Sequence, residues 1–459
     1  MVCEKNVCAC SYCYTMVEGK CEASDRKVLI LGAGMAGVSA AKALGDNGCE
    51  NVQILEGSDR IGGRAKSVNV SGYTMELGAQ WIYGLGSNPV AILAQKYGLQ
   101  MIEDFDTWVV RDDNGTNVTQ TADDEWYNLV DILEKVKVFA RKMDKNGSPD
   151  ITTQALLRKF GWTPDTNVKK AVEVYELDTE SGRETPSLSG KYLDHLSVFE
   201  IHGNDQWMIS SDPRGLSYII SELYKELPSN YTTSFNQVIK KIKNKNGKVE
   251  VETEGGTKYE ADDVIVTFSL GVLQSRQVSF KPALSEEKML AIDKFGFGEY
   301  TIAYFEFSDA FWDNVSTLVY ASARHGENSI WYNMNTIYPG CNILQLTLMG
   351  FEANAASHLN DNEVKESGMA ALAAMYPQLS IPQPDAFVRS DWLTNPLTKG
   401  SFSYWTPAFR PEDRMNLGKS EGNIHFAGEH LGLKTHGFLN SAYNSGQDTA
   451  QRLARSVRN

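Results

Sequence analysis

Two periodicities divide the apolar residues of this chain. Short, fully apolar runs predict buried strands over 28–31, 52–55, 262–268, 300–307 and 343–349, and a glycine turn predicts a hairpin between 248–253 and 257–261. Apolar residues at helical spacing predict helices over 38–44, 124–142, 151–160, 215–227 and 363–375. The mixture predicts an α/β chain with a two-domain, α+β organisation.

The first predicted strand runs directly into the glycine-rich turn Gly32-Ala33-Gly34-Met35-Ala36-Gly37. Gly32 allows the tight bend, Gly34 lets the backbone approach phosphates, and Gly37 lets the helix lie against the strand. The next strand, 52–55, ends in Glu56, where a carboxylate accepts hydrogen bonds from ribose hydroxyls. This complete βαβ unit predicts a dinucleotide site.

A second glycine loop, at 57–63, follows Glu56 and ends in Arg64. NAD enzymes do not usually need this loop, whereas it brings a backbone turn and a cation to the same pyrophosphate in two-dinucleotide-binding flavoproteins. We therefore expect FAD, with Arg64 at the phosphate or flavin side. The alternative is that Arg64 is an ordinary solvated arginine.

Composition and charge limit the class of protein. With 459 residues, 42% hydrophobic and 22% charged, the chain is typical of a globular enzyme of two or three domains. A net charge of −14 argues against nucleic acid or an anionic membrane as partner and suits a cationic substrate. No segment is apolar for long enough to predict a membrane span, and no metal-binding signature is expected to serve catalysis.

Cysteines gather at the N-terminus. Cys3, Cys8, Cys10, Cys13 and Cys21 lie in the first 25 residues, and only Cys49 and Cys341 follow. Disulfides of an oxidising compartment, a metal at Cys10-x-x-Cys13, and an unstructured reduced tail are the three interpretations. Sequons for N-glycosylation at Asn69, Asn114, Asn117, Asn230 and Asn314 favour an extracellular, secreted chain whose signal peptide has been removed, with a cytoplasmic location as the alternative.

The nucleotide-binding pattern returns late in the chain, so the FAD-binding domain is predicted to be discontinuous. The segment 424–430 reads as a strand that ends in Gly428 and Glu429, and Gly437-Phe438-Leu439 opens a C-terminal helix whose N-terminus can face the cofactor. We assign 1–25 to the cysteine-rich tail, 26–89, 213–280 and 392–459 to the FAD-binding domain, and 90–212 and 281–391 to a substrate-binding domain with a mixed sheet flanked by helices.

Five blocks in order, at 32–37, 76–81, 269–273, 399–405 and 424–446, resemble the flavin-containing amine oxidase family, most closely its plant-type polyamine oxidases. The resemblance implies noncovalent FAD between two domains and a small-molecule amine substrate such as spermine or spermidine. It implies oxidation of a C–N bond by hydride transfer to flavin N5, imine hydrolysis, and reoxidation by O2 to H2O2. We expect a monomer or a weak homo-oligomer.

The resemblance also implies roles for particular residues. Phe402 and Phe438 fall where aromatic rings enclose the substrate chain, with Tyr300 nearby and Trp392 beside the flavin. Other positions fall on the cofactor side: Glu429 at the ribityl or pyrophosphate part, the Val238 backbone at the adenine, and the block residues Gln80, Trp81, Gly428, Gly437 and Leu439. Each aromatic residue alone is equally well read as core.

Two positions depart from the family pattern. Ile302 stands where the family has a lysine that holds a water over flavin N5, and Tyr83 stands where plant-type enzymes have an acid that recognises a distant ammonium. An acidic cluster, Glu176, Asp178, Glu180 and Glu184, lines the substrate entrance in one interpretation and a solvated loop in the other. Lys434 and His436 lie just before Gly437, where a cation would favour a carboxylate. A slow oxidase, a dehydrogenase, an L-amino-acid oxidase and a non-catalytic flavoprotein therefore stay open as alternatives.

Overall fold

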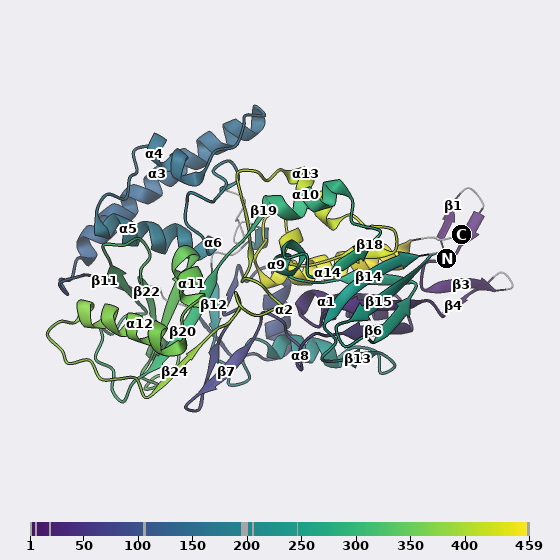
Figure 1. Cartoon of the computed structure of the whole chain (residues 1–459), viewed down its shortest axis with the longest axis horizontal. Helices are drawn as coiled ribbons and strands as arrows, with labels where there is room; N and C mark the ends of the chain where they lie inside the picture. The colour runs from purple at the N-terminus through teal and green to yellow at the C-terminus, as the bar shows by residue number, and fades with distance from the viewer. Residues whose placement is uncertain are drawn as a thin grey trace.

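The computed structural model describes residues 2–4, 7–17, 20–103, 107–193, 201–203, 206–245 and 247–456. Two large sheets lie in opposite halves of the molecule, with both ends of the chain on the side of the smaller one (Figure 1). This mixed helix-and-sheet, two-part organisation confirms the predicted fold class.

A five-stranded parallel sheet carries the glycine-rich turn. Its order is β13-β6-β5-β17-β26, and every pairing is parallel. Residues of β5 and β17 are almost entirely buried, as their apolar runs predict for a sheet covered on both faces. The strands are β5 (Lys27–Leu31), β6 (Asn51–Leu55), β13 (Thr232–Ser234), β17 (Asp263–Val266) and β26 (Ile424–Phe426).

Two helices pack closely beside this sheet, α1 (Met35–Asp46) and α14 (Leu439–Arg455). A Cβ at Gly446 would lie 2.1 Å from the carbonyl oxygen of Ala36, so only glycine permits this approach. The first and the last helix of the nucleotide-binding half, α1 and α14, thereby lie side by side.

A six-stranded mixed sheet forms the other half, in the order β11-β21-β22-β23-β20-β24. Only the β11–β21 pair is parallel. Adjacent residues of β11 point to opposite faces, since Val110 packs with α3, α4 and α5 while Val109 packs with α11 and α12. The strands are β11 (Trp108–Asp112), β20 (Tyr300–Glu306), β21 (Thr317–Ala321), β22 (Ile330–Asn333), β23 (Ile343–Met349) and β24 (Ala386–Arg389).

Smaller sheets and helices complete the described fold. The smaller strands are β1 (Val2–Glu4), β2 (Val7–Ala9), β3 (Tyr14–Val17), β4 (Lys20–Ala23), β7 (Ser67–Val70), β8 (Tyr73–Glu76), β9 (Trp81–Tyr83), β10 (Met101–Glu103), β12 (Trp207–Ser210), β14 (Ile239–Lys245), β15 (Lys248–Thr253), β16 (Lys258–Ala261), β18 (Ser279–Lys281), β19 (Phe295–Phe297) and β25 (Ser403–Trp405). The remaining helices are α2 (Pro89–Lys96), α3 (Thr119–Lys145), α4 (Thr153–Lys159), α5 (Asn167–Glu173), α6 (Thr179–Ser181), α8 (Tyr218–Lys225), α9 (Leu270–Gln274), α10 (Glu286–Lys294), α11 (Gly350–Ser357), α12 (Asp361–Met375) and α13 (Pro411–Gly418). A π-helix, Val174–Asp178, joins α5 to α6.

The strongly periodic elements were predicted well, and the differences lie at their ends. The helix expected over 124–142 is α3, which begins five residues earlier, and the strands 248–253 and 343–349 match β15 and β23. Strands of the parallel sheet come only from segments assigned to the FAD-binding domain, and those of the six-stranded sheet only from segments assigned to the substrate-binding domain. The boundaries themselves stay a prediction.

The N-terminal segment is fastened to the nucleotide-binding half. Cys10 forms a disulfide with Cys21, and Cys13 forms one with Cys49, just after α1. The buried Tyr12 hydroxyl donates to Asp263 at 2.8 Å. The disulfide interpretation is confirmed for these four cysteines, while the side chains of Cys3 and Cys8 lie outside the described residues. The described residues hold no cluster of three metal-ligating side chains and no helix long and apolar enough to cross a membrane.

Candidate active site

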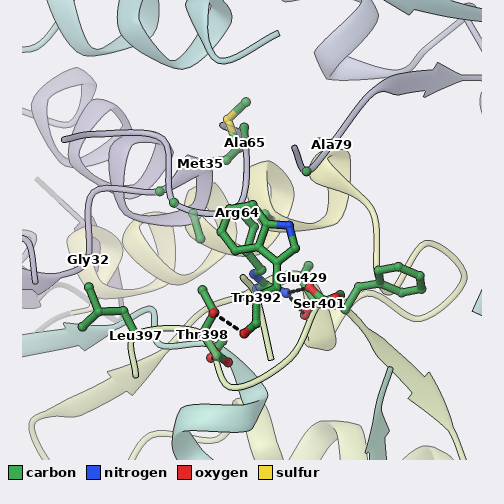
Figure 2. Close-up of a pocket in the computed structure, with 18 of the residues that line it drawn as sticks. Gly32, Met35, Arg64, Ala65, Ala79, Trp392, Leu397, Thr398, Ser401 and Glu429 are labelled. Carbon is green, nitrogen blue, oxygen red and sulfur yellow. Dashed lines mark hydrogen bonds and ion pairs between the residues drawn. The ribbon is translucent and has the colours of Figure 1, made fainter. Parts of the chain in front are cut away.

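A cavity of about 480 Å³ extends from the glycine-rich turn to the six-stranded sheet. Its volume lies in the usual range for ligand pockets. Figure 2 shows part of its lining, in which residues far apart in sequence converge. The lining comes from 32–36, 55–66, 78–83, 179–181, 237–239, 267–278, 300–302, 392–404 and 428–442.

The glycine-rich turn shapes one end of this cavity. Gly32 has a φ of +117°, which favours glycine. A Cβ at Gly37 would lie 1.9 Å from the carbonyl oxygen of Gly32, so Gly37 acts in packing and does not itself line the cavity. Gly34 caps α1 without a side-chain hydrogen bond, and the first N–H groups of the helix are therefore open to an anion. These features fit a pyrophosphate.

Glu56 lies at the end of β6, as predicted. Its Oε2 accepts from the Ala33 N–H at 2.6 Å, and its Oε1 accepts from the Ser58 N–H and hydroxyl at 2.8 Å each. These bonds fix the carboxylate at the cavity edge, and Val238 lines the cavity nearby. The carbonyl oxygen of Val238 already accepts from Glu254 N–H.

The second glycine loop contains two arginines with different surroundings. Arg60 donates to the carbonyl oxygens of Gly63 (2.6 Å) and Ala65 (3.1 Å), so it holds the loop closed. No role was predicted for Arg60, although it lies in the same loop as Arg64. Arg64 instead points across the cavity and pairs with Glu429 at 2.8 Å, while also donating to the Ser401 carbonyl (Figure 2).

Glu429 is the best-connected charged group of the site. Its other oxygen accepts from the Ser403 hydroxyl at 2.6 Å and the Gly437 N–H at 2.9 Å. Burial alone would raise the pKa of this carboxyl, but the charge of Arg64 and these hydrogen bonds outweigh it and lower the pKa to about 2. Glu429 is therefore ionised across the physiological pH range.

Four further residues predicted to bind the cofactor lie around this pair. Gly428 and Gly437 adopt positive φ, at +159° and +87°. Phe438 caps α14 without a side-chain hydrogen bond, and Leu439 begins that helix at the cavity wall. The N-terminus of α14 thus faces the same space as that of α1, and this too favours an anionic cofactor.

Trp392 borders the cavity and is held from behind. Its ring N–H donates to the Leu77 carbonyl at 2.6 Å, and the Thr398 hydroxyl donates to the Trp392 carbonyl at 2.7 Å. A Cβ at Gly78 would lie 1.8 Å from the Arg64 carbonyl oxygen and 3.1 Å from the indole, so this glycine permits the approach of the Arg64 backbone as well as the ring. The position and orientation of Trp392 are consequently fixed by the 76–81 block.

Aromatic rings form the wall at the other end. Tyr300 and Phe402 have ring centroids 5.7 Å apart, and Tyr83 meets Phe438 edge to face at 5.5 Å. All four line the cavity, as does Trp81. The predicted aromatic residues therefore meet in one place.

Ile302 lines the same cavity and is almost fully buried. A polar network lies beside it on the same face of the sheet. The Gln80 amide donates to Gln345 Oε1 at 2.7 Å and to the Tyr304 hydroxyl at 2.8 Å, and the Gln345 amide donates to Thr347 Oγ1 at 3.1 Å. Gln80 is therefore anchored to the six-stranded sheet as well as lining the cavity.

The predicted acidic cluster divides, and only Glu180 reaches the cavity. Glu176 accepts from the Trp126 ring at 2.8 Å, Asp178 bonds His325 at 2.7 Å, and Glu184 accepts from the Phe351 N–H. The interpretation in which all four line an entrance is wrong, because they belong to different local structures. Glu176 and Asp178 lie in the π-helix, Glu180 lies in α6, and Glu184 follows the left-handed turn at Gly182 that ends α6.

Glu180 lines the cavity, and its side chain is exposed although many protein atoms surround it. Burial, and next the charge of Glu176, raise the pKa of Glu180 to about 7. Of the two predicted cations before Gly437, Lys434 does not line the cavity, whereas His436 does and stacks on Trp405 at 4.3 Å.

The described residues fit FAD. Two open helix N-termini, a glycine cradle and a cationic side chain suit a pyrophosphate, and Glu56 suits a ribose. No cysteine lines the cavity in the described part of the chain, in agreement with noncovalent binding. The individual roles of the predicted site residues stay predictions.

Comparisons with known proteins agree with this site. The profile of the family described as flavin containing amine oxidoreductase matches residues 35–454. Polyamine oxidase 1 of Zea mays is 30% identical over 454 residues, covering 93% of this chain and 90% of the relative, and polyamine oxidase 6 of Oryza sativa subsp. japonica is 28% identical with the same coverage. Lysine-specific histone demethylase 2 of Homo sapiens is 25% identical, and the match covers 53% of its length.

Among solved structures, putrescine oxidase bound to putrescine superposes with a TM-score of 0.75 at 20% identity, over 93% of this chain and 98% of that one. At this identity the likeness supports the fold. The family match spans most of the chain and includes all the residues that line the cavity except Gly32 and Gly34. The chain therefore belongs to the flavin-containing amine oxidoreductase family and is an FAD-dependent amine oxidase.

Proposed function

We propose that this enzyme oxidises a C–N bond of a polyamine such as spermine or spermidine. The carrying observation is Glu180, which faces the aromatic end of the cavity with no ion-pair partner among the described residues. Similarity to plant polyamine oxidases supports the same substrate class.

The chain's own residues suit such a substrate. The rings of Tyr83, Tyr300, Phe402 and Phe438 can enclose apolar methylene groups and exclude water, and their faces attract a cation. Glu180 would bind an ammonium group that is not the reacting nitrogen. FAD, when bound, supplies the two-electron oxidant for the C–N bond.

We further propose that reoxidation by O2 is slow, or that another acceptor replaces O2. The observation behind this is Ile302, a side chain with no polar atom to hold a water or supply a positive charge. H2O2 would then be a minor product.

A carboxylate-bearing substrate is less well supported. The arginines and lysines that line the cavity among the described residues are Arg60, Arg64 and Lys66. Both arginines already bond loop carbonyls or Glu429, so neither is free to clamp the carboxylate of an L-amino acid.

Anaerobic reduction tests these proposals. We expect the purified enzyme to be yellow and its flavin absorbance to bleach with spermine or spermidine and not with L-amino acids. Bleaching only with amino acids would reject the polyamine assignment. If no amine bleaches a protein that retains FAD, the chain is a non-catalytic flavoprotein.

A further inference from the structure

The two N-terminal disulfides are unrelated to amine oxidation. Cys10–Cys21 closes a span of 11 residues, and Cys13–Cys49 ties the segment to the end of α1 across 36 residues. Neither lies at the cavity. Structural disulfides of this kind persist in oxidising compartments and are rare where thiols are kept reduced.

The sequence contains six Asn-x-Ser/Thr sequons, a second, independent feature that the catalytic site does not explain. One of them, Asn146-Gly147-Ser148, is followed directly by Pro149 and is left out of the proposal. The other five begin at Asn69, Asn114, Asn117, Asn230 and Asn314. All five asparagines are exposed, and each lies in a turn or loop rather than inside a helix or a named strand, except Asn69, which is at the tip of the β7–β8 hairpin. An oligosaccharide needs an accessible surface position, and each of these asparagines provides one.

Their side-chain contacts are compatible with a glycan. Glycan attachment replaces one of the two amide hydrogens of asparagine, and the other stays available as a donor. Asn230 uses a single donor bond, to the Glu50 carbonyl at 2.6 Å, and Asn114 uses one to Asp113 at 3.1 Å. Asn69 and Asn117 use the amide oxygen as an acceptor, from Gly72 and Thr119. No bond need be broken by modification.

The sequons also leave the reaction unobstructed, since none of the five asparagines lines the cavity. Asn117 has a distinct position, because it pairs with Arg111 of β11, the edge strand of the six-stranded sheet. A glycan there would shield an edge that could otherwise pair with another chain.

We propose that the chain matures in an oxidising secretory compartment and carries N-linked glycans at Asn69, Asn114, Asn117, Asn230 and Asn314. The disulfides and the sequons support the same compartment through different chemistry. The proposal is independent of the substrate.

Protein purified from its natural source, or secreted by a eukaryotic line, is treated with peptide N-glycosidase under native conditions. We expect a loss of intact mass, conversion of the five asparagines to aspartates in peptide maps, and unchanged turnover. Maps without reductant should contain the Cys10–Cys21 and Cys13–Cys49 cross-linked peptides.

Matched variants make the site assignment specific. Asn230→Gln and Thr232→Ala should each remove the same single glycan, because both destroy one sequon, whereas Asn354→Gln, at an exposed asparagine outside any sequon, should remove none. Natural protein without glycosidase-sensitive mass, or with free thiols at Cys13 and Cys49, would overturn the proposal.

Discussion

Substitution of Glu180 by glutamine tests the proposed substrate directly. The change keeps the shape of the side chain and removes its charge, at a carboxylate that faces the aromatic end of the cavity. A hydrogen bond to a charged group contributes about 1.5–3 kcal/mol. Loss of that contact predicts a fall in kcat/KM for spermine of about 10- to 150-fold.

The pH dependence gives a second readout. Burial, followed by the charge of Glu176, raises the pKa of Glu180 to about 7, so the carboxyl is neutral below this pH and ionised above it. Attraction for an ammonium is therefore present above pH 7 and lost as the pH falls. We expect kcat/KM of the wild type to fall on the acid side of about pH 7, and the Glu180→Gln variant to lack this limb.

Glu176 offers a matched control. It accepts a hydrogen bond from Trp126 and does not line the cavity, but its charge contributes to the raised pKa of Glu180. Glu176→Gln should therefore keep the acid limb and move it to lower pH. A Glu180→Gln enzyme with wild-type kcat/KM and an unchanged acid limb would refute the assignment of Glu180 to the substrate.

Three other substitutions test the cofactor side and the sheet behind it. Ile302→Lys should accelerate reoxidation of the reduced enzyme by O2 in stopped-flow mixing; an unchanged rate in a variant that retains FAD would show that the missing lysine is not limiting. Arg64→Ala leaves the buried Glu429 without its cation, which predicts a loss of about 3–5 kcal/mol in stability, measured by denaturant unfolding together with FAD content; an unchanged midpoint and flavin ratio would contradict the role of the pair. Thr347→Val removes the acceptor of a Gln345 amide proton and should cost about 1–3 kcal/mol of unfolding free energy, while Thr347→Ser should cost less; equal losses would point to packing alone.

The nucleotide-binding half could be predicted from sequence because its signals are local. The strand before Gly32, the glycine spacing and the acid at Glu56 lie within one βαβ unit, and each has its own conformational reason. The same is true of α3, whose apolar positions repeat over seven turns. Local sequence also indicated that Gly437 begins the approach to a helix at the cavity.

The site beyond that unit depends on contacts between distant segments, which no local pattern encodes. The pairing of Arg64 with Glu429 joins residues 365 positions apart, and the resemblance placed both near the cofactor without predicting the pair. The acidic run near Glu180 looked uniform in sequence. Its residues separate because Glu176 and Asp178 lie in a π-helix, whereas Glu180 lies in α6 and Glu184 follows the turn at Gly182. A π-helix is rare, and this short apolar and acidic run did not predict one.

The surroundings of Ile302 suit an apolar side chain at this position. Tyr300, Ile302 and Tyr304 alternate along β20 and share one face of the sheet, where β23 contributes Thr347 opposite Ile302. The polar groups on that face bond one another, since the Gln80 amide donates to the Tyr304 hydroxyl and the Gln345 amide donates to Thr347. The four polar side chains of this network therefore have hydrogen-bond partners without a lysine or a water held by one. The strand is therefore internally consistent with an apolar residue at 302, and reoxidation is the step at which this enzyme is expected to diverge from its polyamine oxidase relatives.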